Sequence, residues 1–135
     1  MNQPTATVTD KIILVGNDER LFYLLKRFVE QSPCELIPWL NIPSAAEIIT
    51  LNPSLIIFST IDHLEESQSL LEHTSAHEIP VMVCISLADE AHAHELGADV
   101  CLFHPLSFEN FKNAMSGICQ VEADESGLET KTSGF

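Results

Sequence analysis

Short runs of apolar residues alternate along this chain with longer segments in which apolar residues recur every three or four positions. Four runs are continuous enough to predict strands that are covered on both faces, and they span residues 11–15, 55–58, 80–85 and 100–103. A fifth run, 36–40, contains Pro38, which lacks the N–H that a central strand needs. We therefore expect this strand at the edge of a sheet.

Helix start signals precede the segments between these runs. Asp18 is a candidate N-cap for a helix that continues to about Gln31. Ser44 and Glu47 have the spacing of a capping box, which predicts a helix to about Leu51. The same reasoning predicts three further helices, over 64–75 with an ambiguous start in 61–66, from Ser86 or Asp89 to Leu96, and from Ser107 to about Cys119.

Strict alternation of five strands with five helices predicts a parallel sheet with helices on both faces. The expected fold class is therefore α/β: a three-layer α/β/α sandwich with a doubly wound, five-stranded, flavodoxin-like sheet. A chain of 135 residues fits one such domain, which we place at 11–119. Residues 1–10 are expected to form a flexible N-terminus, and 120–135 an acidic flexible tail or linker.

The net charge of the chain disfavours some classes of binding partner. The chain has 20 acidic and 6 basic residues and a formal net charge of −14. Unaided binding to nucleic acid or to an anionic membrane surface is disfavoured, because both need a cationic footprint. No apolar run approaches the roughly 20 residues of a membrane span, and the polar start lacks a signal-peptide core. We expect a cytoplasmic protein whose partner is another protein with a basic patch.

Neither the cysteines nor the histidines have the spacing of a complete metal site. Cys34, Cys84, Cys101 and Cys119 form no Cys-x-x-Cys pair, and two of them lie in apolar runs as buried thiols do. The histidine pairs are His73 with His77, four apart, and His92 with His94, two apart. Because two ligands do not close a site, we interpret them as surface histidines and predict no metal or cofactor.

Four segments, in this order and spacing, resemble the receiver domains of two-component response regulators. They are the opening strand with Asn17-Asp18-Glu19-Arg20-Leu21, then Pro53-Ser54-Leu55-Ile56-Ile57-Phe58, Ile79-Pro80-Val81-Met82-Val83, and Gly97-Ala98-Asp99 followed by Val100-Cys101-Leu102-Phe103-His104-Pro105-Leu106. The resemblance covers residue 11 to about residue 115. It implies the receiver fold and a role in bacterial signalling.

The same resemblance implies where a phosphorylation site would lie, and every position has an unusual residue. The acidic pair that helps to hold Mg²⁺ falls on Gly16 and Asn17, and the phosphoacceptor aspartate falls on Ser59. The hydroxyl, lysine and aromatic switch positions fall on Ile85, His104 and Cys101.

These replacements remove the chemistry of phosphorylation. Mg²⁺ prefers carboxylate oxygens in octahedral geometry, whereas Gly16 offers only backbone and Asn17 one amide oxygen. The Ser59 hydroxyl cannot form an acyl phosphate, and it is a weak nucleophile without a base. We therefore predict that the pocket is not phosphorylated and that the chain has no catalytic residues.

Several residues near the pocket have two interpretations. Asp18 is either a displaced metal ligand or the N-cap, and cap preference favours the latter. Asp62 is either a carboxylate that leans into the pocket or a solvated loop residue, which we favour. Ser59 with His104 suggests a Ser–His pair, but no orienting acid or Gly-x-Ser-x-Gly turn accompanies it. Ser59 and Thr60 are also candidate acceptors for a Ser/Thr kinase.

The leading hypothesis is a pseudo-receiver, that is, a non-enzymatic and phosphorylation-independent protein-interaction module, with a homodimer through the fourth and fifth helices as an option. The alternative is a receiver-like switch with another input, either phosphorylation of Ser59 or a small ligand at the carboxyl ends of the strands. A third hypothesis is an active receiver in which Asp18 and Asp62 bind Mg²⁺. Trp39 and Phe58 are anchors for a partner if exposed, although core packing is expected for both.

Overall fold

A computed structural model describes residues 10–30 and 34–115 of the chain. Its five strands are β1 (Asp10–Val15), β2 (Cys34–Trp39), β3 (Leu55–Phe58), β4 (Val81–Ile85) and β5 (Val100–Phe103). All pair in parallel, in the order β2-β1-β3-β4-β5. The order reverses between β1 and β3, as it does in doubly wound folds, so the predicted fold class is confirmed.

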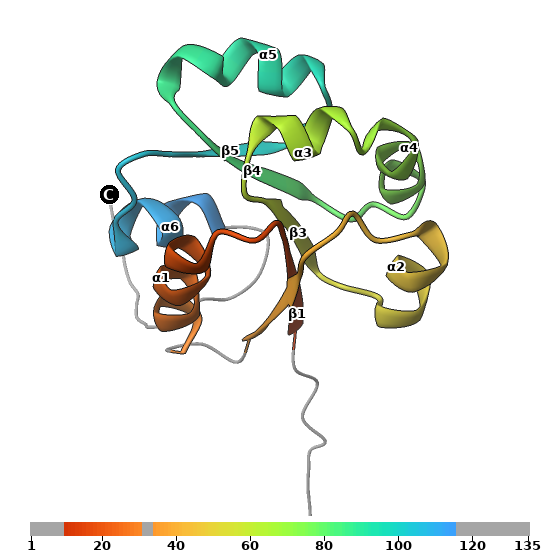
Figure 1. Cartoon of the computed structure of the whole chain (residues 1–135), viewed down its shortest axis with the longest axis horizontal. Coiled ribbons are helices and arrows are strands. Elements are labelled where there is room, and N and C mark those ends of the chain that lie inside the picture. The colour runs from red at the N-terminus through yellow and green to blue at the C-terminus, as the bar shows by residue number, and fades with distance from the viewer. Residues whose placement is uncertain (1–9, 31–33, 116–135) are drawn as a thin grey trace, which may run out of the picture.

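Helices cover both faces of this sheet (Figure 1). One layer consists of α1 (Glu19–Val29) and α6 (Phe108–Met115). The other consists of α2 (Ala45–Leu51), α3 (Ile61–Glu65), α4 (Gln68–Ala76) and α5 (Glu90–Glu95), with a short 3₁₀ turn at Leu87–Asp89 before α5. No helix in the described part of the chain is long and apolar enough to span a bilayer.

Alternation along the strands divides the core between the two layers. In β1, Ile12 and Leu14 belong to the apolar cluster under α1 and α6, whereas Ile13 and Val15 belong to the cluster under α2–α5. The strands β3 and β4 alternate in the same way and are buried throughout. These strands are therefore covered on both faces, as their continuous apolar runs predict.

Local signals in the sequence account for most element boundaries. Asp18 caps α1 by accepting a hydrogen bond from the Leu21 N–H at 3.0 Å. Ser44 and Glu47 form both bonds of the predicted capping box. β2, which contains Pro38, lies at the sheet edge as expected, although it spans Cys34–Trp39 rather than 36–40.

The prediction of one helix over 64–75 is wrong, because this region forms α3 and α4 with a break at Ser67. Thr60 starts α3 early by accepting a hydrogen bond from the His63 N–H. At the break, the buried Ser67 hydroxyl donates to the His63 carbonyl at 2.7 Å. The Gln68 side-chain amide donates to the carbonyls of Leu64 and Leu96, which ties the break to the end of α5.

One other predicted helix end and two predicted segments lie outside the described residues. α1, by contrast, ends within them, at Val29, two residues before the predicted end near Gln31. α6 is described to Met115, and the predicted end near Cys119 lies beyond it. The predicted flexible N-terminus (1–10, except Asp10) and acidic tail (120–135) also lie outside.

Candidate functional site

The positions that the resemblance assigns to a phosphorylation pocket meet at the carboxyl edge of the sheet. Gly16 follows β1 and Ser59 follows the neighbouring β3, with Val15 opposite Phe58 in the register. The Ser59 N–H donates to the Val15 carbonyl at 3.0 Å, and the Gly16 N–H donates to the Trp39 carbonyl at 2.9 Å. The parallel ladders thus place Gly16 beside Ser59 at the topological switch point.

Ser59 fills the space that a side chain at position 16 would need. A Cβ atom built on Gly16 would overlap the Ser59 hydroxyl oxygen and lie 2.9 Å from the Ser59 Cβ. Gly16 also has a φ of +129°, which side-chain-bearing residues rarely adopt. Ser59 itself is only 5% exposed. The centre of the pocket is therefore occupied by this glycine–serine contact.

The two residues after Gly16 are exposed, and neither adds to a metal site. The Asp18 carboxylate caps α1, so its predicted N-cap role is confirmed. Asn17 is also exposed, at the start of the loop that leads to α1. Within residues 10–30 and 34–115, no group of three or more His, Cys, Asp or Glu side chains is arranged to hold a metal ion.

The loop prediction for Asp62 is wrong, because this exposed residue lies in the first turn of α3. The turn forms because Thr60, in an extended conformation, caps it. The Thr60 hydroxyl also contacts the His63 Nδ1 at 2.7 Å. The His63 Cε1 lies 3.6 Å from the Cβ position built on Gly16, so His63 borders the pocket.

Sequence reasoning missed His63. The signal was present, because Thr60 precedes it by three residues, which is the spacing of an N-cap with its third helical residue. The unrecognised start of α3 hid this signal.

The remaining pocket positions offer no charge or hydroxyl group to the centre. Ile85 is 4% exposed and belongs to the apolar cluster under α2–α5. The His104 side chain is exposed, and its backbone N–H donates to the Ile85 carbonyl at 3.1 Å. In the described structure Ser59 and His104 share no hydrogen bond, so the Ser–His pair considered above is not formed.

The switch position holds a half-buried thiol that contacts α5. The Cys101 Sγ lies 3.8 Å from the Nε2 of His94, whose Nδ1 lies 2.9 Å from the Ala98 carbonyl oxygen. Burial, and secondarily the negative charge of Glu90, raises the pKa of the Cys101 thiol. This position therefore carries a small neutral side chain that is held against α5.

The second thiol in an apolar run, Cys84, is buried as predicted. Desolvation, with a smaller contribution from Asp18, raises its pKa to about 12. It is therefore a packing residue in the cluster under α1 and α6.

The histidine pairs have separate contacts. The rings of His73 on α4 and of His77 at its C-terminal cap lie against each other, with centroids 4.5 Å apart. The buried Nε2 of His73 has no hydrogen-bond partner among the described residues. His92 on α5 contacts Glu65 on α3 at 3.0 Å, and this hydrogen bond raises the pKa of His92. His94 contacts Ala98 and Cys101 instead, so His92 and His94 face different sides of α5, as their spacing predicts.

Of the two candidate anchors, Phe58 is a fully buried core residue, as expected. Trp39 is partly buried and packs against the cluster under α2–α5. The exposed large apolar residues of the described chain are instead Tyr23, Leu40, Ile49 and Leu87.

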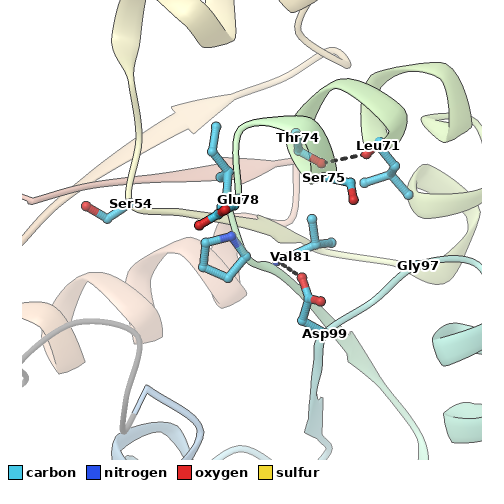
Figure 2. A pocket seen from close by; sticks show the side chains of 10 residues that line it. Ser54, Leu71, Thr74, Ser75, Glu78, Val81, Gly97 and Asp99 are labelled. Atoms are coloured by element: carbon cyan, nitrogen blue, oxygen red, sulfur yellow. Dashed lines mark hydrogen bonds between the residues drawn. The ribbon is translucent and has the colours of Figure 1, made fainter.

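A hollow of about 790 Å³ lies at the opposite, amino-terminal edge of the sheet (Figure 2). Two of the polar side chains that line it form hydrogen bonds within the protein. Asp99 accepts a hydrogen bond from the Val81 N–H at 2.8 Å, and Thr74 donates to the Leu71 carbonyl at 3.0 Å. The Gly97-Ala98-Asp99 segment therefore has a structural role, in which Asp99 fixes the start of β4 beside β5.

No protein-family model matches the chain, and a search of curated proteins finds no match. Solved structures do match. The chemotaxis protein CheY4 of Vibrio cholerae has a TM-score of 0.67 and 12% identity over 83% of this chain and 100% of that one. The signal receiver domain of a DNA-binding response regulator from Colwellia psychrerythraea has a TM-score of 0.64 and 17% identity, over 79% and 95%.

A receiver-modulated diguanylate cyclase structure from Pelobacter carbinolicus also matches, with a TM-score of 0.61 and 20% identity over 79% of this chain and 89% of that one. The chain therefore has the α/β fold of response-regulator receiver domains. Its pocket positions carry none of the residues that the resemblance calls for.

Proposed function

We propose that this chain is a receiver-like domain that works without aspartyl phosphorylation, as a protein-interaction module in bacterial two-component-type signalling. The fold likeness to receivers supports the signalling context. The contact between Gly16 and Ser59 supports the absence of phosphorylation, because it fills the pocket centre with a buried serine.

The electrostatics around the pocket favour the same proposal. Phosphoryl transfer needs Mg²⁺ and a cation to neutralise the charge that develops on the phosphoryl oxygens. Asn17 supplies one neutral amide at the edge, and His104 replaces the lysine with a group that is cationic only when protonated. Ile85 places a buried apolar side chain where a hydroxyl group would follow the phosphoryl oxygen.

The interaction surface would be fixed rather than switched. A receiver with an aromatic switch can reposition a large ring, whereas Cys101 carries a small thiol held beside His94. The partner is a protein with a basic patch, because α2–α5 carry acidic residues and no Lys or Arg. Association through α5, β5 and α6 to form a homodimer is part of the same proposal.

The alternative switch hypothesis requires access to the pocket. Ser59 is 5% exposed, so a Ser/Thr kinase would need the β3–α3 junction to open before it reached the hydroxyl. Thr60 is exposed, but its hydroxyl caps α3, so phosphorylation there would perturb the first turn. The interaction module is therefore the function that the geometry supports best.

Acetyl phosphate with Mg²⁺ tests the proposal directly, with intact mass spectrometry as the readout. A receiver domain that retains its aspartate serves as the positive control. We expect no phosphoryl adduct on this chain under conditions that label the control. A stoichiometric, hydroxylamine-sensitive adduct would overturn the proposal, because that lability identifies an acyl phosphate.

A further inference from the structure

Two of the four exposed large apolar side chains of the described chain lie within residues 34–51, which form β2, α2 and the loop between them. Leu40 directly follows β2 and is 67% exposed, and Ile49 on α2 is 55% exposed. Single exposed apolar residues are common, but several in one small region beside an apolar hollow mark a surface at which another protein binds.

Such a hollow, of about 290 Å³, lies between β2 and α2. Trp39 at the end of β2 lines it together with Ala46, Thr50 and Leu51 of α2, and Glu47 is its one charged residue. Ligand sites commonly measure about 300–1,000 Å³, so a hollow of this size suits one large side chain. We call it the β2–α2 hollow.

Trp39 gives the hollow a fixed aromatic surface. The residue packs against the apolar cluster under α2–α5 but is only partly buried. Its indole N–H has no hydrogen-bond partner among the described residues. Tryptophan is enriched among the residues that dominate binding energy at protein interfaces, and its ring face attracts cations.

The Glu47 carboxylate is held in place by the capping box of α2. Its Oε1 accepts a hydrogen bond from the Ser44 N–H at 2.8 Å, and the Ser44 hydroxyl accepts one from the Glu47 N–H at 3.1 Å. The other carboxylate oxygen has no partner within the described part of the chain. Because the side chain is already ordered, pairing with a cation costs little further conformational entropy.

The charges around the hollow are predominantly negative. β2, α2 and the loop between them contain two acidic residues, Glu35 and Glu47, and no Lys or Arg. The adjoining β1 and the start of α1 also have more acidic than basic residues, which are Asp10, Asp18 and Glu19 against Lys11 and Arg20. A second copy of this chain, with its net charge of −14, would be repelled, whereas a cationic partner is attracted.

Pro38 disfavours a second copy for another reason. β2 is an edge strand, and edge strands can pair through their outward N–H and C=O groups. The Trp39 carbonyl accepts the Gly16 N–H, so the polar groups of Trp39 face β1 and those of its neighbour Pro38 face outward. Pro38 lacks the N–H that strand pairing would use there. This region is therefore suited to binding side chains rather than an added strand.

We propose that the β2–α2 hollow binds a segment of a partner protein in which one large apolar side chain is flanked by Lys or Arg. The apolar side chain enters the hollow beside Trp39, and a flanking cation pairs with Glu47. This inference rests on the proposed role as a protein-interaction module, and it names the surface through which the basic partner binds.

Amide NMR titration of the full chain with a capped peptide, Gly-Arg-Leu-Arg-Gly, tests the proposal. We expect saturable shifts at Trp39, Ala46 and Glu47 with millimolar peptide. Gly-Arg-Ser-Arg-Gly should bind about tenfold more weakly, because it lacks the apolar side chain that is buried on binding. Gly-Glu-Leu-Glu-Gly should not bind, because its charges are reversed.

Two variants separate the contributions of charge and shape. Glu47→Gln keeps the capping box but removes the charge, so we expect about three- to fivefold weaker binding. Ala46→Gln places a polar side chain over the hollow and should also weaken binding several-fold. Glu72→Gln and Ala91→Gln are the matched controls, because they make the same changes at exposed positions outside the hollow.

The proposal is overturned if millimolar peptide produces no saturable shifts, if the three peptides bind equally, or if the two variants lose no more affinity than their controls. Shifts of the hollow residues that follow protein concentration without peptide also overturn it, because they place a second copy there. The acetyl phosphate experiment is independent of this one. A phosphoryl adduct on a chain that binds the peptide would overturn only the proposed function, and an unlabelled chain that does not bind the peptide would overturn only this inference.

Discussion

Replacing Gly16 with alanine tests how the pocket centre is built. The new Cβ would overlap the Ser59 hydroxyl oxygen and lie 2.9 Å from the Ser59 Cβ, so the two side chains cannot both keep their positions. Overpacking of a well-packed interior costs about 1–3 kcal/mol. The φ of +129° adds backbone strain of about 1–3 kcal/mol for a non-glycine residue.

We therefore expect Gly16→Ala to lower the free energy of unfolding by about 2–6 kcal/mol, a large share of the ~5–15 kcal/mol typical of a domain. Urea denaturation measures this, and a slope of about 2 kcal/mol per M makes it a midpoint shift of roughly 1–3 M. Gly97→Ala is the matched control. Its φ is +109°, but its Cβ would meet only the end of the Leu71 side chain at 3.3 Å, so the strain acts almost alone.

A double-mutant cycle with Ser59→Gly separates the two causes. In the Ser59→Gly background, Gly16→Ala should lose the overpacking cost of about 1–3 kcal/mol and keep the strain. A cost for Gly16→Ala that is within 0.5 kcal/mol of that for Gly97→Ala, as roughly expected for strain alone, would refute the steric reasoning. An unchanged cost in the Ser59→Gly background would refute it as well.

Three other measurements check separate parts of the structure. Ser44→Ala removes the capping box of α2 and should lower the free energy of unfolding by about 1 kcal/mol in urea, whereas Ser69→Ala, at an exposed position with no recorded cap, should change it little. Because the pKa of Cys84 is raised to about 12, its thiol should resist alkylation at pH 8 until urea unfolds the chain, as peptide mass mapping would show; rapid native labelling would contradict its burial. Because the hydrogen bond with Glu65 raises the pKa of His92 above the ordinary 6.5, NMR titration should show a downward shift of that pKa in Glu65→Gln, and the stabilising contact should be present below pH 6.5 and lost as the pH rises through the raised pKa.

The sheet and most helix starts could be predicted because their causes are local. Continuous apolar runs marked β1, β3, β4 and β5, and Pro38 marked the edge strand. Asp18 and Ser44 are caps whose hydrogen bonds span three residues. Such signals depend on neighbours in the sequence and need no knowledge of tertiary contacts.

The break between α3 and α4 could not be predicted in the same way. It is stabilised by the buried Ser67 and by the bond from Gln68 to the Leu96 carbonyl, 28 residues away. The periodicity of the segment continues through the break, so it favoured one helix. The position of Asp62 was missed for a different reason, because the local N-cap signal of Thr60 at the start of α3 was not recognised.

The pocket positions could be predicted one by one, but the way they fit together could not. In the sequence, Gly16 and Ser59 are two separate positions that lack an expected carboxylate. The structure shows that these two residues contact each other. A groove that Tyr23 and Phe108 line between α1 and α6 also depends on packing, because these residues are 85 positions apart in the sequence. Contacts of this kind follow from the register of the sheet and the packing of the helices.

The most direct test of the central claim is an amide NMR titration of the full chain with Mg²⁺, followed by beryllofluoride, a mimic of the aspartyl phosphate. We expect no localised, saturable shifts at Asn17, Ser59 or His104 with either addition. Saturable shifts confined to these residues would show that the pocket still binds a metal or phosphoryl group, and they would contradict a phosphorylation-independent module.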